Sequence, residues 1–267
     1  MWGKQTSQGF VKQLAERGTK PFLWMFKDWL STGTISYYMH NDGGWCTRTY
    51  LHNYYALLAG EPFPAEWEVL FYTRQGKLAH RLSGAFNGPE TVVIDSADLK
   101  NLDIHGVIYT HIRVKSPQYF FPEQYSSIFF NEYYIPGTDR SIFAHNLGGS
   151  LKATHYSYHR LGTSAVTPPG FRPHLFLANA CAFHPWGHSD CGRATVTVIN
   201  HAEIKKTIVV PPFPSLSCQK LDLFALCPEL PEHMNNQSYI LEVEGKNILA
   251  KPFLFQTNGT QCLAEHL

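Results

Sequence analysis

The stretch from Trp67 to Leu99, WEVLFYTRQGKLAHRLSGAFNGPETVVIDSADL, aligns without a gap with the stretch from Ala194 to Leu226, ATVTVINHAEIKKTIVVPPFPSLSCQKLDLFAL, 127 positions later. Few residues are identical, and the two stretches share their apolar pattern and their turns. The alignment places Val69 on Val196, Phe71 on Val198, Ile94 on Leu221 and Asp95 on Asp222. An internal repeat of this kind predicts one β-rich unit used twice. Function should then be sought where the two copies differ.

The composition is typical of short strands and many turns. Only 16% of the residues are charged and 14% are aromatic, and 20 Gly and 17 Pro interrupt the chain. We therefore predict an all-β fold of two tandem antiparallel β-sandwich-like units. The expected strands are a hairpin over Thr34–Tyr55, then Glu68–Thr73, Lys77–Leu82, Thr91–Ile94, Val107–Val114, Ser127–Tyr134 and Ser141–Ala144, and in the second copy Thr195–Ile199, Lys205–Val210, Gln219–Phe224, Tyr239–Val243 and Lys251–Phe255.

A short helical segment is predicted to precede the repeat. Residues 8 to 18 suit an amphipathic helix that ends at Gly18, and a second short helix begins near Pro21. Thr167-Pro168-Pro169-Gly170 is the best candidate linker. The predicted organisation is a helical N-terminal segment over 1–33, a first sandwich unit over 34–166 and a second, shorter unit over 171–267.

The charge balance and the cysteines indicate which binding partners and which cellular compartment to expect. The 22 Lys and Arg nearly balance the 21 Asp and Glu, which argues against nucleic acid or an anionic membrane surface as a partner. The six cysteines show no C-x-x-C spacing and are interpreted as reduced thiols. The N-terminus lacks the apolar core of a secretory signal, and no apolar run is long enough to span a bilayer. We expect a cytoplasmic protein.

Three short segments share a pattern with a known family. They are Val107–Ser116 (VIYTHIRVKS) in the first copy, and Ile208–Pro211 and Lys220–Leu223 in the second. Their pattern resembles that of the sensory-rhodopsin-transducer superfamily of small β-sandwich proteins. The resemblance implies an oligomeric module that binds a small molecule, such as a sugar, with His111 and Arg113 near its ligand face. The second copy has Glu242 and Glu244 on the comparable strand, so a site there would differ or be absent.

Histidines gather around the junction of the two copies and suggest a metal site as an alternative. His155 and His159 would lie about 13 Å apart on a strand, too far to share one ion. His184-Pro-Trp-Gly-His188 is a loop that could turn both rings toward one Zn or Fe ion, together with His145 or His155. No H-E-x-x-H or C-x-x-C motif accompanies it. The alternative is therefore a metal-dependent enzyme centred on His184 and His188.

Aromatic residues support binding of a small polar molecule. Between Tyr119 and Tyr134 they alternate with carboxylate and amide side chains, a combination that suits the apolar faces and hydroxyl groups of a sugar or of a similar ligand. No motif for nucleophilic catalysis is present, so we expect a binding or interaction module with no cofactor, and a homo-oligomer. The predicted ligand-binding residues are His111, Arg113, His145, Asn146, His155 and His159.

Overall fold

The structure is a computed structural model that describes residues 32–53, 56, 62, 64–114, 129–145, 158–179, 192–200, 205–228, 237–246 and 252–266. Strands dominate these residues, and every strand pairing among them is antiparallel. The predicted all-β class is confirmed. The helices predicted before residue 31 lie outside the described residues, and Thr32 already belongs to the first strand.

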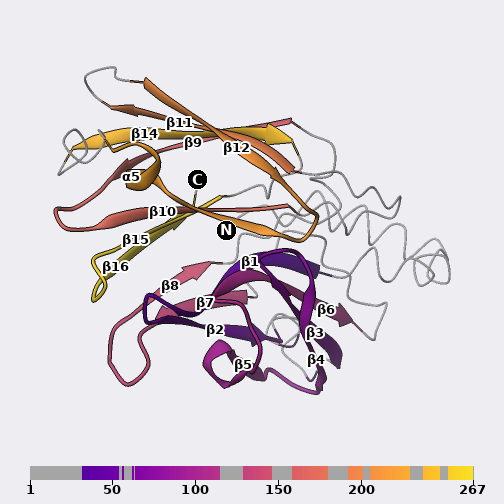
Figure 1. Ribbon diagram of the computed structural model, residues 1–267. Coiled ribbons are helices and arrows are strands. Elements are labelled where there is room, and N and C mark those ends of the chain that lie inside the picture. The colour runs from indigo at the N-terminus through magenta and orange to yellow at the C-terminus, as the bar shows by residue number, and fades with distance from the viewer. Residues whose placement is uncertain are drawn as a thin grey trace, which may run out of the picture.

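The first half forms one extended sheet, the lower, purple part of Figure 1. Its elements are β1 (Thr32–Asp42), β2 (Trp45–His52), β3 (Ala65–Thr73), β4 (Leu78–Phe86), β5 (Thr91–Asp95), the 3-10 turn η1 (Ser96–Asp98), β6 (His105–Val114), β7 (Phe129–Tyr134) and β8 (Ser141–His145). The strand order is β4-β3-β6-β1-β2-β7-β8, with β5 paired to β2. β1 and β2 meet at a hairpin whose turn uses Gly43 and Gly44 at positive φ, which glycine adopts without strain.

The second half forms two four-stranded sheets, which lie one above the other in the upper part of Figure 1. Its elements are β9 (Tyr158–Val166), β10 (Arg172–Ala178), β11 (Gly192–Asn200), β12 (Lys205–Phe213), β13 (Cys218–Asp222), the helix α5 (Leu223–Leu226), β14 (Ser238–Lys246), β15 (Phe253–Thr257) and β16 (Cys262–His266). One sheet has the order β12-β11-β14-β9 and the other β13-β10-β15-β16.

Six of the seven strand pairings of the first half recur in the second. They are β1–β6, β3–β6, β3–β4, β2–β5, β2–β7 and β7–β8, which correspond in order to β9–β14, β11–β14, β11–β12, β10–β13, β10–β15 and β15–β16. The β1–β2 pairing has no counterpart, because β9 and β10 lie in different sheets. β3, β4 and β5 begin at residues 65, 78 and 91, and β11, β12 and β13 begin 127 positions later at residues 192, 205 and 218. Asp95 and Asp222 each cap the short helix that follows, by accepting hydrogen bonds from its first backbone N–H groups.

One predicted strand ends earlier in the structure than the sequence suggests. Gln219–Phe224 is predicted as a strand, but the strand ends at Asp222 and Leu223 begins α5. The side chain of Asp222 accepts from the backbone N–H groups of Phe224 and Ala225, which favours a helical turn over continued extension. The apolar residues that follow are therefore helical.

Three apolar clusters make up the core. One, with Val69, Phe71 and Ile108, lies inside the first half, and one, with Val196, Leu241 and Leu254, lies between the two sheets of the second half. The third joins the halves. It packs one face of the sheet β13-β10-β15-β16 against the first half, and its largest members are Tyr37, Trp45, Tyr133, Phe176, Phe253 and Phe255.

The strands β10 and β15 are therefore buried on both faces. Leu175 and Leu177 point into the core of the second half, while Phe176 and Ala178 point into the contact with the first half. The predicted linker begins inside the second half, because Thr167 is fully buried there and donates a hydrogen bond from Oγ1 to Oε1 of Gln256 at 2.7 Å. No helix among the described residues is long and apolar enough to cross a membrane.

Candidate functional site

The outward face of the strands β5, β2, β7 and β8 gathers the polar and aromatic residues of the first half. Along β2 and β7 the side chains alternate, so that Thr49 and Asn131 face inward. Thr49 donates to Oδ1 of Asn131 at 3.0 Å, and Asn131 donates to the carbonyl of Tyr37 at 3.3 Å. These buried bonds hold the register of β2 and β7, which places Arg48 opposite Glu132 on the outer face.

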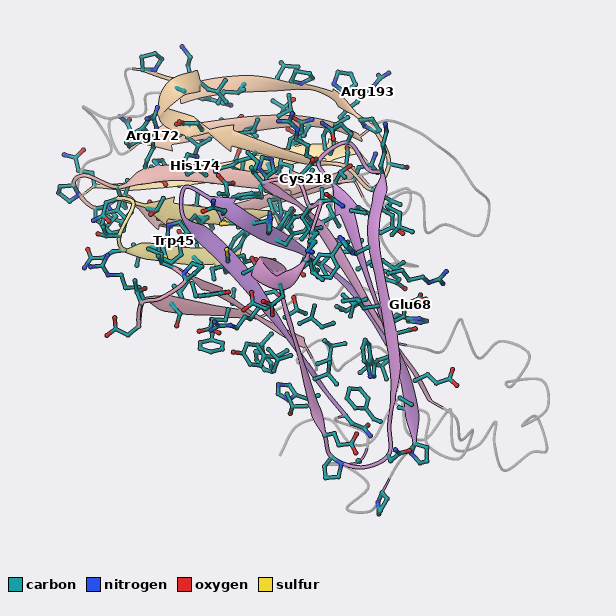
Figure 2. The ribbon with its side chains drawn as sticks, turned by 60° about the horizontal axis from the view of Figure 1, so that its bottom comes forward. Trp45, Glu68, Arg172, His174, Arg193 and Cys218 are labelled. Carbon is teal, nitrogen blue, oxygen red and sulfur yellow. The ribbon has the colours of Figure 1, made fainter. Side chains whose placement is uncertain are left out.

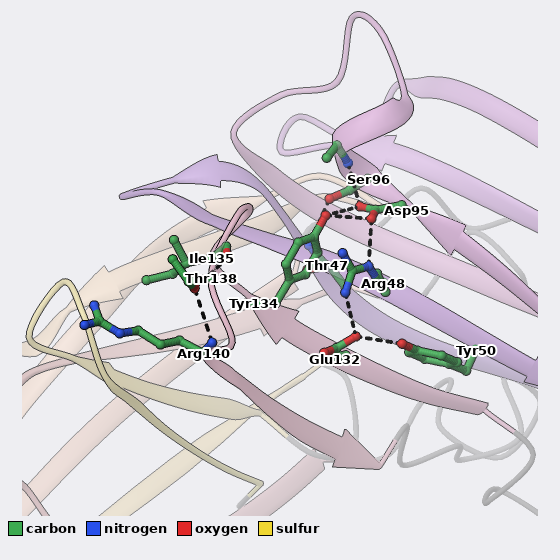
Figure 3. Close-up of polar contacts among 11 residues, drawn as sticks. Thr47, Arg48, Tyr50, Asp95, Ser96, Glu132, Tyr134, Ile135, Thr138 and Arg140 are labelled. Atoms are coloured by element: carbon green, nitrogen blue, oxygen red, sulfur yellow. Dashed lines mark hydrogen bonds and ion pairs between the residues drawn. The ribbon is translucent and has the colours of Figure 1, made fainter.

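Arg48 is the centre of the network on this face (Figure 3). Its Nε donates to Oδ2 of Asp95 at 2.8 Å, and its Nη1 lies 3.3 Å from Oε2 of Glu132. Its guanidinium carbon lies 3.6 Å from the centre of the Tyr134 ring. Three strands thus supply one network: β2 the cation, and β5 and β7 the two carboxylates.

Two phenols complete the network. The hydroxyl of Tyr50 donates to Oε2 of Glu132 at 2.7 Å, and that of Tyr134 donates to both carboxylate oxygens of Asp95 at 2.6 Å. Burial and the neighbouring carboxylate raise the pKa of both tyrosines, so they stay neutral donors at physiological pH. Partial burial lowers the pKa of Arg48, but hydrogen bonds to Asp95 and Glu132 and the Tyr134 contact outweigh it, and the pKa is raised.

One carboxylate oxygen of the network has no hydrogen-bond partner among the described residues. Oε2 of Glu132 accepts from both Arg48 and Tyr50, whereas Oε1 accepts no hydrogen bond from a described residue. One guanidinium faces two carboxylates, so the network has a formal charge of −1. This charge favours a neutral ligand with hydroxyl donors over an anion.

Aromatic rings lie on the same strands as this network. Tyr50 and Phe143 lie with ring centroids 5.8 Å apart, and His52 and Phe130 with ring centroids 5.7 Å apart. The Phe143 side chain, on β8, is 59% exposed although it is large and apolar. An exposed ring beside a hydrogen-bonded carboxylate is the usual arrangement for stacking a sugar ring and binding its hydroxyl groups.

The matching face of the second half has different residues and a different environment. His174 pairs with Asp222 and Phe255 as Arg48 pairs with Asp95 and Glu132. By the same pairing Phe176 occupies the place of Tyr50. In the second half this face packs against the first half, where Phe176 and Phe255 are buried in the contact and Lys220 forms an ion pair with Asp42. In the first half it is charged, with Val93 and Phe143 about half exposed.

His111 and Arg113, predicted as ligand residues, lie on β6. His111 pairs with Gly33 and Glu68, is 6% exposed, and stacks on the ring of Tyr109 with centroids 5.8 Å apart. The Arg113 backbone pairs with Glu66, and its side chain lies outside the described residues. A hollow of about 330 Å³ beside this strand is lined by Glu66, Trp67, Glu68, Ser83, Gly84 and Ala85; Figure 2 labels Glu68 there.

The remaining predicted residues are not brought together by the described structure. The His145 backbone pairs with Phe130 at the end of β8, and the His159 backbone pairs with Gly245 in the second half. Asn146, His155, His184 and His188 lie outside the described residues, as do the side chains of His145 and His159. Within the described ranges, no group of three His, Cys, Asp or Glu side chains could hold a metal ion.

The residues of the outward network were not among the predicted site residues. Glu132 and Tyr134 belong to the aromatic stretch that suggested a sugar site, so their signal was present in the sequence. Arg48 and Asp95 carried no such signal, because only the pairing of β2 with β5 brings them together. No family model matches this chain, and no curated protein matches it in sequence.

Proposed function

We propose that the outward face of β5, β2, β7 and β8 binds a neutral, sugar-like molecule. In this proposal the exposed Phe143 ring stacks on the ligand, Oε1 of Glu132 accepts from its hydroxyl groups, and Arg48 and Tyr50 hold that carboxylate in place. The ligand is bound without being transformed. The resemblance to the sensory-rhodopsin-transducer superfamily suggests the same class of ligand.

The proposal rests on the difference between the two matching faces. We interpret the chain as two tandem sandwich-like units, supported by the recurring pairings and by the 127-residue offset of three strands. The second unit covers its face against the first, and that face is aromatic. The first unit has acidic and basic residues in the matching positions and exposes Phe143. A purely structural face has no need of the exposed Phe143 ring.

Binding of neutral oligosaccharides tests this proposal. The fluorescently labelled protein is first screened on an array of neutral and acidic glycans, and the best neutral ligand is then titrated by calorimetry. Glu132→Gln keeps the shape but removes the charge, and we expect it to weaken binding by about tenfold. The control is Val209→Ala, which changes an apolar side chain that is 77% exposed on the second half.

Two outcomes would overturn the proposal. One is that no neutral saccharide binds at millimolar concentration while the protein remains folded. The other is that a saccharide binds equally well to the Glu132→Gln variant and to the unchanged protein. Preference for acidic over neutral glycans would also count against it, because the network has a formal negative charge.

A further inference from the structure

The sequence contains two Asn-Gly pairs, Asn87-Gly88 and Asn258-Gly259. The first lies in the turn from β4 to β5, and the second lies in the turn from β15 to β16, at the tip of the yellow hairpin in Figure 1. Both asparagines are exposed. In an Asn-Gly pair the backbone nitrogen can attack the side-chain carbonyl carbon of the asparagine, because glycine has no Cβ to shield the nitrogen or restrict the backbone. The two turns place the same pair in different surroundings.

The reacting groups of the first pair are unrestrained. Within the described ranges, neither the side-chain amide of Asn87 nor the N–H of Gly88 has a hydrogen-bond partner. A Cβ built on Gly88 would have no atom within 4 Å, so the space beside the glycine is open. The Asn87 side chain can therefore turn toward the Gly88 nitrogen without breaking a hydrogen bond or displacing a neighbour.

The second pair is held by its own turn. The N–H of Gly259 donates to Oγ1 of Thr257 at 2.9 Å. Oδ1 of Asn258 accepts from the backbone N–H groups of Thr260 and Gln261, at 3.0 and 2.8 Å. Ring closure needs the Gly259 nitrogen without its proton and the Asn258 carbonyl carbon facing it, so these hydrogen bonds must break first. The turn therefore protects Asn258.

We propose that Asn87 is a site of spontaneous deamidation in the folded protein, whereas Asn258 is protected. The Gly88 nitrogen loses its proton and bonds to Cγ of Asn87, the Cγ–Nδ2 bond breaks, and the amide nitrogen leaves as ammonia. Water then adds to one of the two carbonyl carbons of the resulting succinimide and cleaves its bond to the Gly88 nitrogen. Cleavage at Cγ gives aspartate, and cleavage at the backbone carbonyl carbon gives isoaspartate.

Deamidation changes this turn in two ways. Both products carry a new carboxylate, and the backbone N–H of Asn87 lies 3.4 Å from Oε2 of Glu90, so two negative charges come close. Isoaspartate also adds one carbon atom to the backbone before Gly88. The Gly88 carbonyl, which accepts from Nδ2 of the buried Asn53 at 2.7 Å, must then move. We therefore expect the isoaspartyl form to be less stable than the original protein.

Ageing of the whole chain tests the proposal. The protein is kept in mildly alkaline buffer, folded in one series and unfolded in guanidinium chloride in the other. Mass spectrometry of the separated proteolytic peptides measures the conversion of each amide to a carboxyl group. In the folded protein Asn87 should convert about tenfold faster than Asn258 or more, because Asn258 must first break hydrogen bonds. In guanidinium chloride the two asparagines should convert at similar rates.

Two variants test the cause of the difference in the folded protein. Thr257→Val removes the hydroxyl that accepts from the Gly259 N–H, and it should speed conversion of Asn258 severalfold while leaving Asn87 unchanged. Gly88→Ala should slow conversion of Asn87 and leave Asn258 unchanged. The proposal fails if Asn258 converts as fast as Asn87 in the folded protein, if guanidinium chloride leaves the ratio of the two rates unchanged, or if Asn87 stays intact while the unfolded chain converts.

Discussion

Nζ of Lys220 in β13 lies 2.8 Å from both carboxylate oxygens of Asp42 in β1, so a nearly buried ion pair joins the two halves. His105 adds a contact, with its Nδ1 3.3 Å from Oδ2 of Asp42. Burial raises the pKa of Asp42, but the bonds to His105 and Lys220 outweigh it and hold the pKa below its ordinary value. The carboxylate is therefore charged in the folded protein at neutral pH.

Lys220→Met should lower the free energy of unfolding by about 2–4 kcal/mol, because it leaves the Asp42 carboxylate buried without its main partner. Urea denaturation at pH 7 measures this loss. The double variant with Asp42→Asn should regain part of it, since no uncompensated charge remains. A change below about 0.5 kcal/mol in Lys220→Met would show that the pair contributes nothing to joining the halves.

His174 should make the protein less stable in mild acid. Burial, followed by the charge of Lys220, lowers the pKa of His174 from 6.5 to about 4. The unfolded chain therefore binds the proton first, and stability is complete above about pH 6.5 and declines as the pH falls toward 4. After allowance for partial solvent exposure of the ring, we expect a contribution of about 2 kcal/mol.

Urea denaturation at pH 7.5 and at pH 4.5 measures this effect. His174→Gln has no titrating ring, so the loss of stability between the two pH values should be smaller in the variant than in the unchanged protein. Equal losses in the two proteins would contradict the prediction. Asp42 does not cause the same loss between pH 7.5 and pH 4.5. Its pKa is lowered in the folded protein, so the stability that it contributes is lost only at still lower pH.

Gly106 in β6 is predicted to be intolerant of a side chain. A Cβ there would lie 2.1 Å from the carbonyl oxygen of Tyr72 and 2.7 Å from the ring and hydroxyl of Tyr38. Gly106→Ala should therefore destabilise the fold by about 2–3 kcal/mol, since both neighbours are packed. Gly162→Ala is the matched control, because its nearest atoms lie 3.5 Å away and ordinary contact is possible. Thermal unfolding that ranks the two variants in the opposite order would refute this packing argument.

The strand positions could be predicted from the sequence, because the alternation of apolar and polar residues and the turn motifs are local signals. The expected Thr91–Ile94 and Lys205–Val210 lie within β5 and β12, and the Asn41–Gly44 turn joins β1 to β2. The same local signals failed at Gln219–Phe224, where a side-chain cap overrides apolar alternation. Such a cap depends on a single aspartate, so in the sequence it is hard to distinguish from the end of a strand.

The site could not be predicted from the sequence in the same way, because long-range pairing builds it. Arg48 and Glu132 are 84 positions apart and meet only because β2 pairs with β7. Which face of a strand is open also depends on the packing of the halves. Phe130 and Phe253 occupy matching positions, yet Phe253 is fully buried in the contact between the halves while Phe130 is partly exposed.

Phe253 should be essential to the contact between the halves. Its ring stacks on Tyr133 with centroids 5.0 Å apart, lies 5.9 Å from that of Tyr37, and is fully buried. Phe253→Ala should cost about 3–5 kcal/mol of unfolding free energy. Because the contact is large and apolar, calorimetry of the unchanged protein should show one cooperative transition. Two well-separated transitions in the unchanged protein would indicate that the halves fold independently.

Phe143 should matter for binding and not for stability. Its ring is 59% exposed and contacts Tyr50 beside Glu132, so little packing is lost when it is removed. Phe143→Ala should shift the unfolding free energy by less than about 0.5 kcal/mol. It should weaken binding of the neutral saccharide by about fivefold to tenfold, which is the contribution expected of one stacked ring. Calorimetric titration and urea denaturation of the same preparation measure the two quantities. Unchanged affinity would remove Phe143 from the site, whereas a large loss of stability would mean that the ring is a core residue whose effect on binding is indirect.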